Sequence, residues 1–213
     1  MDPFFGDVSE VLWLDLEAPW KTIGSLREIL EGILPEGRRI EEGAVIEEGV
    51  SLGEGKLFLG RRAKVEPGVV FAGGPVYVGE GAEIRAGAYI RGPVFLAPGA
   101  VVGHATEVKN ALFLPRARAP HFNYVGDSIL GENVNLGAGV ILSNFKLDGG
   151  PVKVTWRGAR EHTGLNKLGA ILGKDCSLGC NAVCNPGTVL EPGARVFPLT
   201  VVRGGGKSPK DVG

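Results

Sequence analysis

Residues 78–108 read VGEGAEIRAGAYIRGPVFLAPGAVVGHATEV, and an apolar side chain returns at every sixth position of this stretch. The anchors of the repeat are Val78, Ile84, Ile90, Leu96, Val102 and Val108. A small or β-branched residue follows four positions after an anchor, as at Ala82, and the residue just before it is often a glycine, as at Gly81. Because glycine tolerates the positive φ of a tight corner, each six-residue unit predicts one short strand and one corner.

The same period extends over most of the chain. Its further anchors are Ile40, Ile46, Leu52, Phe58, Val65 and Phe71 before this stretch, and Leu114, Leu130, Leu136, Leu142, Leu172, Leu178, Cys184, Leu190, Val196 and Val202 after it. An amphipathic helix repeats about every 3.6 residues and a half-buried strand every two, so neither explains this spacing. Three such strands would make one triangular coil, and coils stacked about 4.8 Å apart would bury a column of aliphatic side chains.

Two intervals interrupt the repeat. Residues 115–129 separate anchors that lie 16 positions apart, which is not a multiple of six, so we expect a break in the coil there. In residues 145–170 the hexad positions would fall on polar side chains that a core does not accept unpaired, namely Asp148, Arg160 and Asn166. We therefore expect an extended loop at 145–170. Its basic character, with Lys146, Lys153, Arg157, Arg160 and Lys167, fits either a loop that holds anionic groups or a solvated loop.

The first 38 residues lack the repeat and predict a cap with one helix. Residues 11–16, VLWLDL, predict a short strand, and 19–34 predict an amphipathic helix with an apolar stripe of Trp20, Ile23, Leu30 and Ile33. Such a helix would cover the unpaired edge at one end of a solenoid and block edge-to-edge aggregation, although docking of another protein is an alternative. We expect a β-helix over 39–202 and a mobile tail over 203–213, where the repeat ends.

Composition and charge exclude several classes of protein. With 213 residues and 44% hydrophobic content, the chain predicts one principal folded domain. A net charge of −1 gives no electrostatic argument for nucleic acid or an anionic membrane as a partner. The sequence contains no apolar run long enough to span a bilayer, and its acidic start lacks the features of a signal peptide, so we expect a cytoplasmic protein.

The cysteines and histidines are few. Cys176, Cys180 and Cys184 form a C-x3-C-x3-C pattern that lacks the CxxC pair of structural zinc sites, and two of them fall on core positions, so buried thiols are the expected role. His162 lies in the polar loop, and His104 falls near a corner and is expected to face outward. His121 lies three residues before Tyr124 and is the strongest candidate for chemistry.

Three segments of the sequence carry a resemblance to a known family. RGPVFLAPGAVVGHATEVKNALF, APHFNYVGD and GENVNLGAGVILSN contain the motifs E-V-K, H-x-x-Y-x-G-D and N-x-G-A-G. From about Gly79 to Val202 the chain resembles the C-terminal acetyltransferase half of the bifunctional enzyme that makes UDP-N-acetylglucosamine, which acts in nucleotide-sugar biosynthesis. The resemblance implies a left-handed parallel β-helix, a homotrimer and acetyl-CoA as cosubstrate, with no metal required.

The resemblance also implies roles for individual residues. His121 would be the general base, which suits an imidazole that is largely neutral at pH 7, and Asn144 would lie near the acetyl group. The residues that would bind the sugar phosphate are Arg91, Glu107, Lys109, Tyr124 and Asn135, with Lys153 as the candidate for a loop lysine of the family. Two cations and a hydroxyl group suit a phosphate dianion.

The chain also departs from the family. Phe145 replaces the usual tyrosine after Asn144, and the loop over residues 146–167 is longer, as in archaeal-type sugar-1-phosphate relatives whose amino-sugar preference is broader. A glycine-rich G-x-G-T-R-M loop, which marks the family's nucleotidyltransferase domain, does not occur in the sequence. We therefore expect acetyl transfer without nucleotide transfer, with a separate nucleotidyltransferase as a conceivable partner.

Three functions are consistent with these observations. The first is acetyl-CoA-dependent N-acetylation of an amino-sugar 1-phosphate similar to glucosamine 1-phosphate. The second is a non-catalytic β-helix that binds or senses sugar phosphates or nucleotide sugars. The third is a zinc hydratase that shares histidines between subunits, for which the sequence offers no closely spaced histidine pair.

Overall fold

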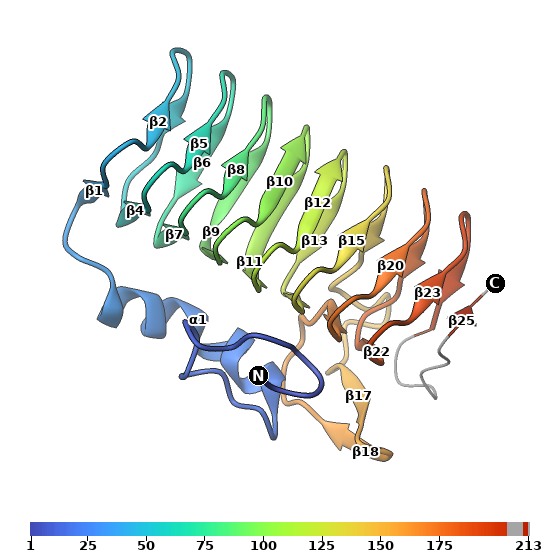
Figure 1. Ribbon diagram of the computed structural model, residues 1–213. Helices are drawn as coiled ribbons and strands as arrows, with labels where there is room; N and C mark the ends of the chain where they lie inside the picture. The colour runs from blue at the N-terminus through green and yellow to red at the C-terminus, as the bar shows by residue number, and fades with distance from the viewer. Residues whose placement is uncertain (204–210, 213) are drawn as a thin grey trace.

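The computed structural model describes residues 1–203 and 211–212 and shows a parallel β-helix of about nine coils (Figure 1). Strands of neighbouring coils pair in parallel, for example with Val102 opposite Ala119. Each coil passes through three faces, which we call faces 1, 2 and 3. The expected fold class, a mainly β left-handed parallel β-helix, is confirmed.

The strands of each face follow one another along the stack. Face 1 consists of β3 (Ser51–Leu52), β6 (Val70–Gly73), the first halves of β9 (Tyr89–Leu96) and β11 (Glu107–Phe113), β13 (Tyr124–Gly126), β16 (Ile141–Leu142), β21 (Val183–Cys184) and β24 (Val201–Val202). Face 2 consists of β1 (Arg38–Ile40), β4 (Leu57–Leu59), β7 (Val76–Val78), the second halves of β9 and β11, β14 (Ile129–Leu130), β19 (Ala170–Leu172) and β22 (Thr188–Leu190). Face 3 consists of β2 (Val45–Ile46), β5 (Lys64–Val65), β8 (Glu83–Ile84), β10 (Val101–His104), β12 (Arg118–His121), β15 (Asn135–Leu136), β20 (Ser177–Leu178), β23 (Arg195–Val196) and β25 (Asp211–Val212).

The interior is a column of aliphatic side chains. The anchors over 78–108 are all fully buried in it. Two predicted anchors are wrong: Phe58 packs outside the column while Leu57 and Leu59 point inward, and Phe113 takes the place of Leu114. At the start of the solenoid, Ile40 is 51% exposed because β1 pairs with β4 on one side and with no described strand on the other.

The expected break over residues 115–129 does not occur. This segment forms a full coil, in which β12 pairs with β10 and β13 pairs with β11. The period of six does not predict this coil, because two corners are shorter than in the regular repeat. Asn110 and Asp127, each with a φ of 47°, make a turn with one residue fewer than the other corners use. Asparagine and aspartate tolerate this left-handed conformation, so a single residue can make the turn.

The basic segment after Leu142 leaves the coil. It forms an antiparallel hairpin of β17 (Lys153–Trp156) and β18 (Ala159–His162), with Lys153 opposite His162. A bridge between Phe145 and Lys167 closes the base of the insertion. The coil then resumes at β19, where Ile171 pairs with Ile129 of β14. The hairpin therefore projects from the corner between faces 1 and 2.

The N-terminal segment differs from the prediction in two respects. Residues 11–16 form turns rather than a strand, with Leu14 N donating to Val11 O at 2.7 Å. The helix α1 (Pro19–Ile33) begins at a proline as expected, but Ile33 is exposed and Leu26 is buried in its place. The apolar stripe is therefore shifted toward the middle of the helix.

Helix α1 lies along the flank of the solenoid and not across its end (Figure 1). Its buried face packs on outward side chains of face 2, among them Leu112 and Ile129. Arg27 donates from Nη1 to Gly74 O at 2.8 Å and from Nη2 to Gly92 O at 3.0 Å, which fixes the helix against two successive corners. Within the described residues, none of the helices is long and apolar enough to cross a membrane.

Candidate active site

Four of the predicted site residues lie on three consecutive strands of face 1. Arg91 is on β9, Glu107 and Lys109 are on β11, and Tyr124 is on β13. In the parallel register Glu107 lies opposite Tyr124, and Lys109 lies opposite Arg91. Parallel pairing places such residues about 4.8 Å apart along the stack. The β-helix thus converts distant sequence positions into one polar surface.

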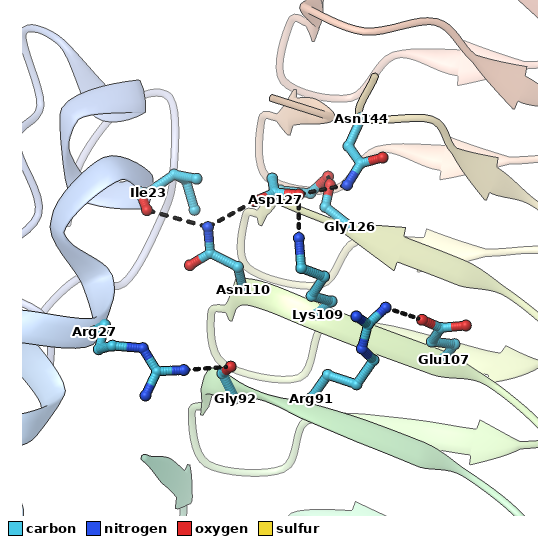
Figure 2. A network of polar contacts seen from close by, with 11 residues as sticks. Ile23, Arg27, Arg91, Gly92, Glu107, Lys109, Asn110, Gly126, Asp127 and Asn144 are labelled. Carbon is cyan, nitrogen blue, oxygen red and sulfur yellow. Dashed lines mark hydrogen bonds and ion pairs between the residues drawn. The ribbon is translucent and has the colours of Figure 1, made fainter. Parts of the chain in front are cut away.

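Both cations of this surface are paired with carboxylates (Figure 2). Arg91 Nη1 donates to Glu107 Oε1 at 2.9 Å, and this hydrogen bond raises the pKa of Arg91. Lys109 Nζ lies 3.6 Å from Asp127 Oδ2. The surface therefore carries nearly balanced charge before any ligand binds.

Asp127 is a residue to which the sequence assigned no role. Its side chain is only 6% exposed, and its Oδ1 accepts a hydrogen bond from Asn110 Nδ2 at 2.7 Å. Its Oδ2 accepts from the amide nitrogen of Asn144 and faces Lys109. The signal was present, because Asp127 is the final residue of the H-x-x-Y-x-G-D motif, but its burial depends on the coil geometry.

Tyr124 and Asn144 meet above Gly126. A Cβ atom at Gly126 would lie 2.7 Å from both Asn144 Nδ2 and Tyr124 Oη, so only glycine allows this approach. Burial raises the pKa of Tyr124, and the negative charges of Glu107 and Asp127 raise it further. The phenol therefore stays protonated at neutral pH and can donate a hydrogen bond.

His121 lies at the corner between faces 3 and 1, at the exposed end of β12. His104 lies directly opposite it in the register of β10, so the fold brings together two histidines that are not close in sequence. His104 Nδ1 lies 3.0 Å from Ala86 O, and the ring of Phe122 lies 5.9 Å from each imidazole. His104 faces outward, as predicted.

Two predicted site residues lie apart from face 1. Asn135 is on face 3, opposite Arg118 and exposed. Lys153 is on the hairpin, where it lines a cavity of about 740 Å³. The full lining is Ser143, Phe145, Lys146, Leu147, Asp148, Lys153, Arg160, Asn185, Pro186 and Arg203. Asn144 connects the two regions, because its chain neighbours line the cavity while its side chain reaches Asp127.

The cysteines do not form part of this site. Cys176 and Cys184 are buried as predicted, and burial raises the pKa of each thiol to about 12. Cys180 is exposed. Among the described residues, no group of three His, Cys, Asp or Glu side chains has a geometry that could hold a metal ion.

Comparison with known proteins gives several matches. Residues 72–191 match the model of a family described as the GMPPB C-terminal domain. A bifunctional sugar-1-phosphate nucleotidylyltransferase/acetyltransferase of Sulfurisphaera tokodaii is 32% identical over 195 residues, which cover 91% of this chain and 47% of that protein. A bifunctional protein GlmU of Methanocaldococcus jannaschii is 34% identical over 176 residues, or 82% of this chain and 41% of that protein.

The chain thus spans less than half the length of these two curated relatives. Among solved structures, an Arabidopsis UDP-N-acetylglucosamine acyltransferase aligns with a TM-score of 0.48 at 13% identity, over 84% of this chain and 68% of that chain.

Proposed function

Because this chain belongs to the family of the GMPPB C-terminal domain, we propose that it transfers an acetyl group from acetyl-CoA to the amine of an amino-sugar 1-phosphate. The observation that carries this proposal is the junction at Asn144, where the polar surface of face 1 adjoins a cavity rich in cations. The hydroxyl and amine groups of an amino-sugar phosphate would bind to the polar surface, and its phosphate would bind to the cations. The relative from Sulfurisphaera tokodaii is named a bifunctional sugar-1-phosphate nucleotidylyltransferase/acetyltransferase, which supports the same reaction class.

His121 acts as the general base in this reaction. As the substrate nitrogen attacks the thioester carbonyl carbon, the imidazole takes one proton from the amine. The carbon–sulfur bond then breaks, CoA leaves as the thiolate and receives a proton, and the amide remains on the sugar. The exposed position of His121 at a corner allows a substrate on face 1 to reach it.

Asn144 orients the amine through its side-chain oxygen. Since the carboxylate of Asp127 can only accept hydrogen bonds, the nitrogen of the Asn144 amide must face Asp127. The same nitrogen lies next to the Tyr124 hydroxyl over Gly126. The side-chain oxygen of Asn144 is therefore free to accept a hydrogen bond from an N–H of the substrate amine.

The phosphate binds at the hairpin cavity, next to Lys153. Arg91 and Lys109 are each paired with a carboxylate, so neither offers an uncompensated charge to a dianion. Lys146 is also paired, with Asp148 at 2.9 Å. Lys153, Arg160 and Arg203 line the cavity without an ion pair to any described residue. Charge-assisted hydrogen bonds from such cations suit a phosphate.

The active form is a homotrimer with sites between subunits. Asn135 lies on face 3 and Lys109 on face 1, so the two would serve one substrate only if a neighbouring copy supplied one of them. Large apolar side chains also remain exposed beside face 1, including Phe122, Leu199 and Val201. A contact between copies would cover them.

The purified chain is tested with acetyl-CoA and either glucosamine 1-phosphate or galactosamine 1-phosphate, with the N-acetylated product quantified by mass spectrometry. We expect turnover with at least one sugar, and at least ~100-fold lower kcat for His121→Ala, as for loss of a general base. His162→Ala, at the end of β18, is the control for loss of an imidazole and should keep the wild-type kcat, because His162 lies opposite Lys153 on the hairpin and away from His121. Wild-type activity in His121→Ala would rule out the assigned base. Binding of a sugar phosphate without any acetylated product would instead support a non-catalytic β-helix that binds or senses sugar phosphates.

A further inference from the structure

A column of corner side chains runs between helix α1 and the candidate site (Figure 2). Asn110 Nδ2 donates to Ile23 O of α1 at 3.2 Å and to Asp127 Oδ1 at 2.7 Å. Asp127 Oδ2 in turn accepts from Asn144 and faces Lys109. The two oxygens of one carboxylate thus serve opposite directions, one toward the helix and one toward the site.

Because the Asp127 carboxylate is buried, it depends on the hydrogen-bond donors around it. The Asp127 side chain is 6% exposed, and a buried carboxylate is costly unless charged and polar donors surround it. Asn110, Asn144 and Lys109 supply those donors. None of these interactions reaches the cavity at the hairpin, whose lining does not include Asp127. Asp127 therefore lies behind the residues that face a substrate.

We propose that Asp127 is a positioning residue, which holds the amide of Asn144 and the ammonium group of Lys109 in their working orientations. This inference rests on the proposed acetyl transfer, in which both residues face the substrate. Asp127 acts through them and touches no substrate atom. An asparagine at position 127 would present an amide group, against which the Asn144 amide could flip.

The test is a double-mutant cycle with Asp127→Asn and Asn144→Ala. We expect Asp127→Asn alone to lower kcat ~10- to 100-fold, as expected for a misplaced reacting group, with the KM for acetyl-CoA within about threefold. In the Asn144→Ala background, the same change should lower kcat by a clearly smaller factor, because only its effect on Lys109 remains. Equal losses in both backgrounds, or an unchanged kcat in the single variant, would overturn the inference.

Two matched controls come from another corner of the solenoid. Asn133 has a φ of 59° and donates to Asp175 Oδ1 at 3.0 Å, which repeats the Asn110–Asp127 arrangement away from the site. Asp175→Asn should therefore leave kcat unchanged. Glycine accepts a positive φ, so Asn110→Gly removes the link to α1 without backbone strain, and Asn133→Gly is its control. We expect only Asn110→Gly to reduce kcat.

A crystal structure of Asp127→Asn separates this inference from the proposed function. If the wild type transfers no acetyl group to either sugar, the function fails but the structural question remains. A changed orientation of the Asn144 amide or a displaced Lys109 side chain supports the positioning role. Both side chains in their wild-type places would overturn it, whatever the activity.

Discussion

At the scale of single residues, carboxylates organise the candidate site as much as cations do. Glu107 neutralises Arg91, and Asp127 faces Lys109 while accepting two amide hydrogen bonds. Such pairs fix long, flexible side chains before a ligand arrives, and this lowers the entropy lost on binding. The surface is therefore preorganised to recognise hydroxyl and amine groups, whereas net positive charge is concentrated at the cavity.

Gly126→Ala tests how closely this surface is packed. The new methyl group would lie 2.7 Å from Asn144 Nδ2 and from Tyr124 Oη, so one or both side chains must move. We expect kcat to fall at least about tenfold through misplacement, with a stability loss of roughly 1–3 kcal/mol from overpacking. Steady-state kinetics and thermal unfolding measure the two effects.

The control for this change is Gly32→Ala. Gly32 lies in α1 and a Cβ there meets nothing within 4 Å, so the variant should keep its kcat and gain up to ~1 kcal/mol in stability from better helix propensity. If Gly126→Ala matched Gly32→Ala in kcat, the close approach of Tyr124 and Asn144 would have no catalytic importance.

The same residues show how far sequence reasoning reaches. The motifs pointed to residues that are far apart in sequence, and Arg91, Glu107, Lys109, Tyr124 and Asn144 do lie on or beside one surface, while their roles stay a prediction. Asp127 belongs to one of the motifs, but its role could not be predicted, because a carboxylate's burial cannot be inferred from its neighbours in sequence. Family membership, which the motifs indicated, is confirmed.

At the scale of elements, departures from the repeat define the site. The one-residue corners at Asn110 and Asp127 shorten their coils, and the next coil opens at the same corner into the hairpin. A strict period of six predicted the regular coils correctly. The period could not predict that residues 115–129 form a coil, because it assumes corners of constant length. Asn110 and Asp127 adopt a left-handed conformation and make shorter corners.

Lys153→Met tests the role of the hairpin. If the cavity holds the substrate phosphate, losing one charge-assisted hydrogen bond should raise the KM for the sugar phosphate about tenfold or more, with a smaller effect on kcat. Arg157→Met is the matched control, because Arg157 belongs to the same hairpin but pairs with Glu17 at 2.6 Å. Initial-rate measurements with each substrate varied in turn give the two KM values.

A different pattern would move the phosphate elsewhere. A rise in the KM for acetyl-CoA alone would assign the cavity to the cosubstrate. An unchanged KM for both substrates would show that Lys153 contributes to neither, and the paired cations of face 1 would then be the remaining ligands.

At the scale of the whole molecule, the solenoid uses its three faces differently. Face 2 is covered by α1 and the N-terminal segment, whose apolar side chains pack on Phe95, Leu112 and Ile129. The amphipathic pattern of α1 predicted a buried stripe, but it could not predict the surface that buries it, and the expected cap at the end of the stack proved wrong. Face 1 carries the polar surface and, beyond it, an outward row of Ile141, Val183 and Val201.

Val201→Glu tests whether this row lies between subunits. Val201 is 58% exposed in the single chain, so a glutamate there costs the isolated β-helix little. In a homotrimer the same carboxylate would be buried against a neighbouring copy, where an unpaired charge is strongly unfavourable. We expect light scattering to show a trimer for the wild type and a monomer for Val201→Glu, with acetyl transfer lost together with the trimer.

Leu12→Glu, at a residue 85% exposed on the N-terminal segment, should remain trimeric and active. A trimeric, active Val201→Glu would exclude this row from the interface, and a monomeric wild type with full activity would mean that one chain alone forms the site.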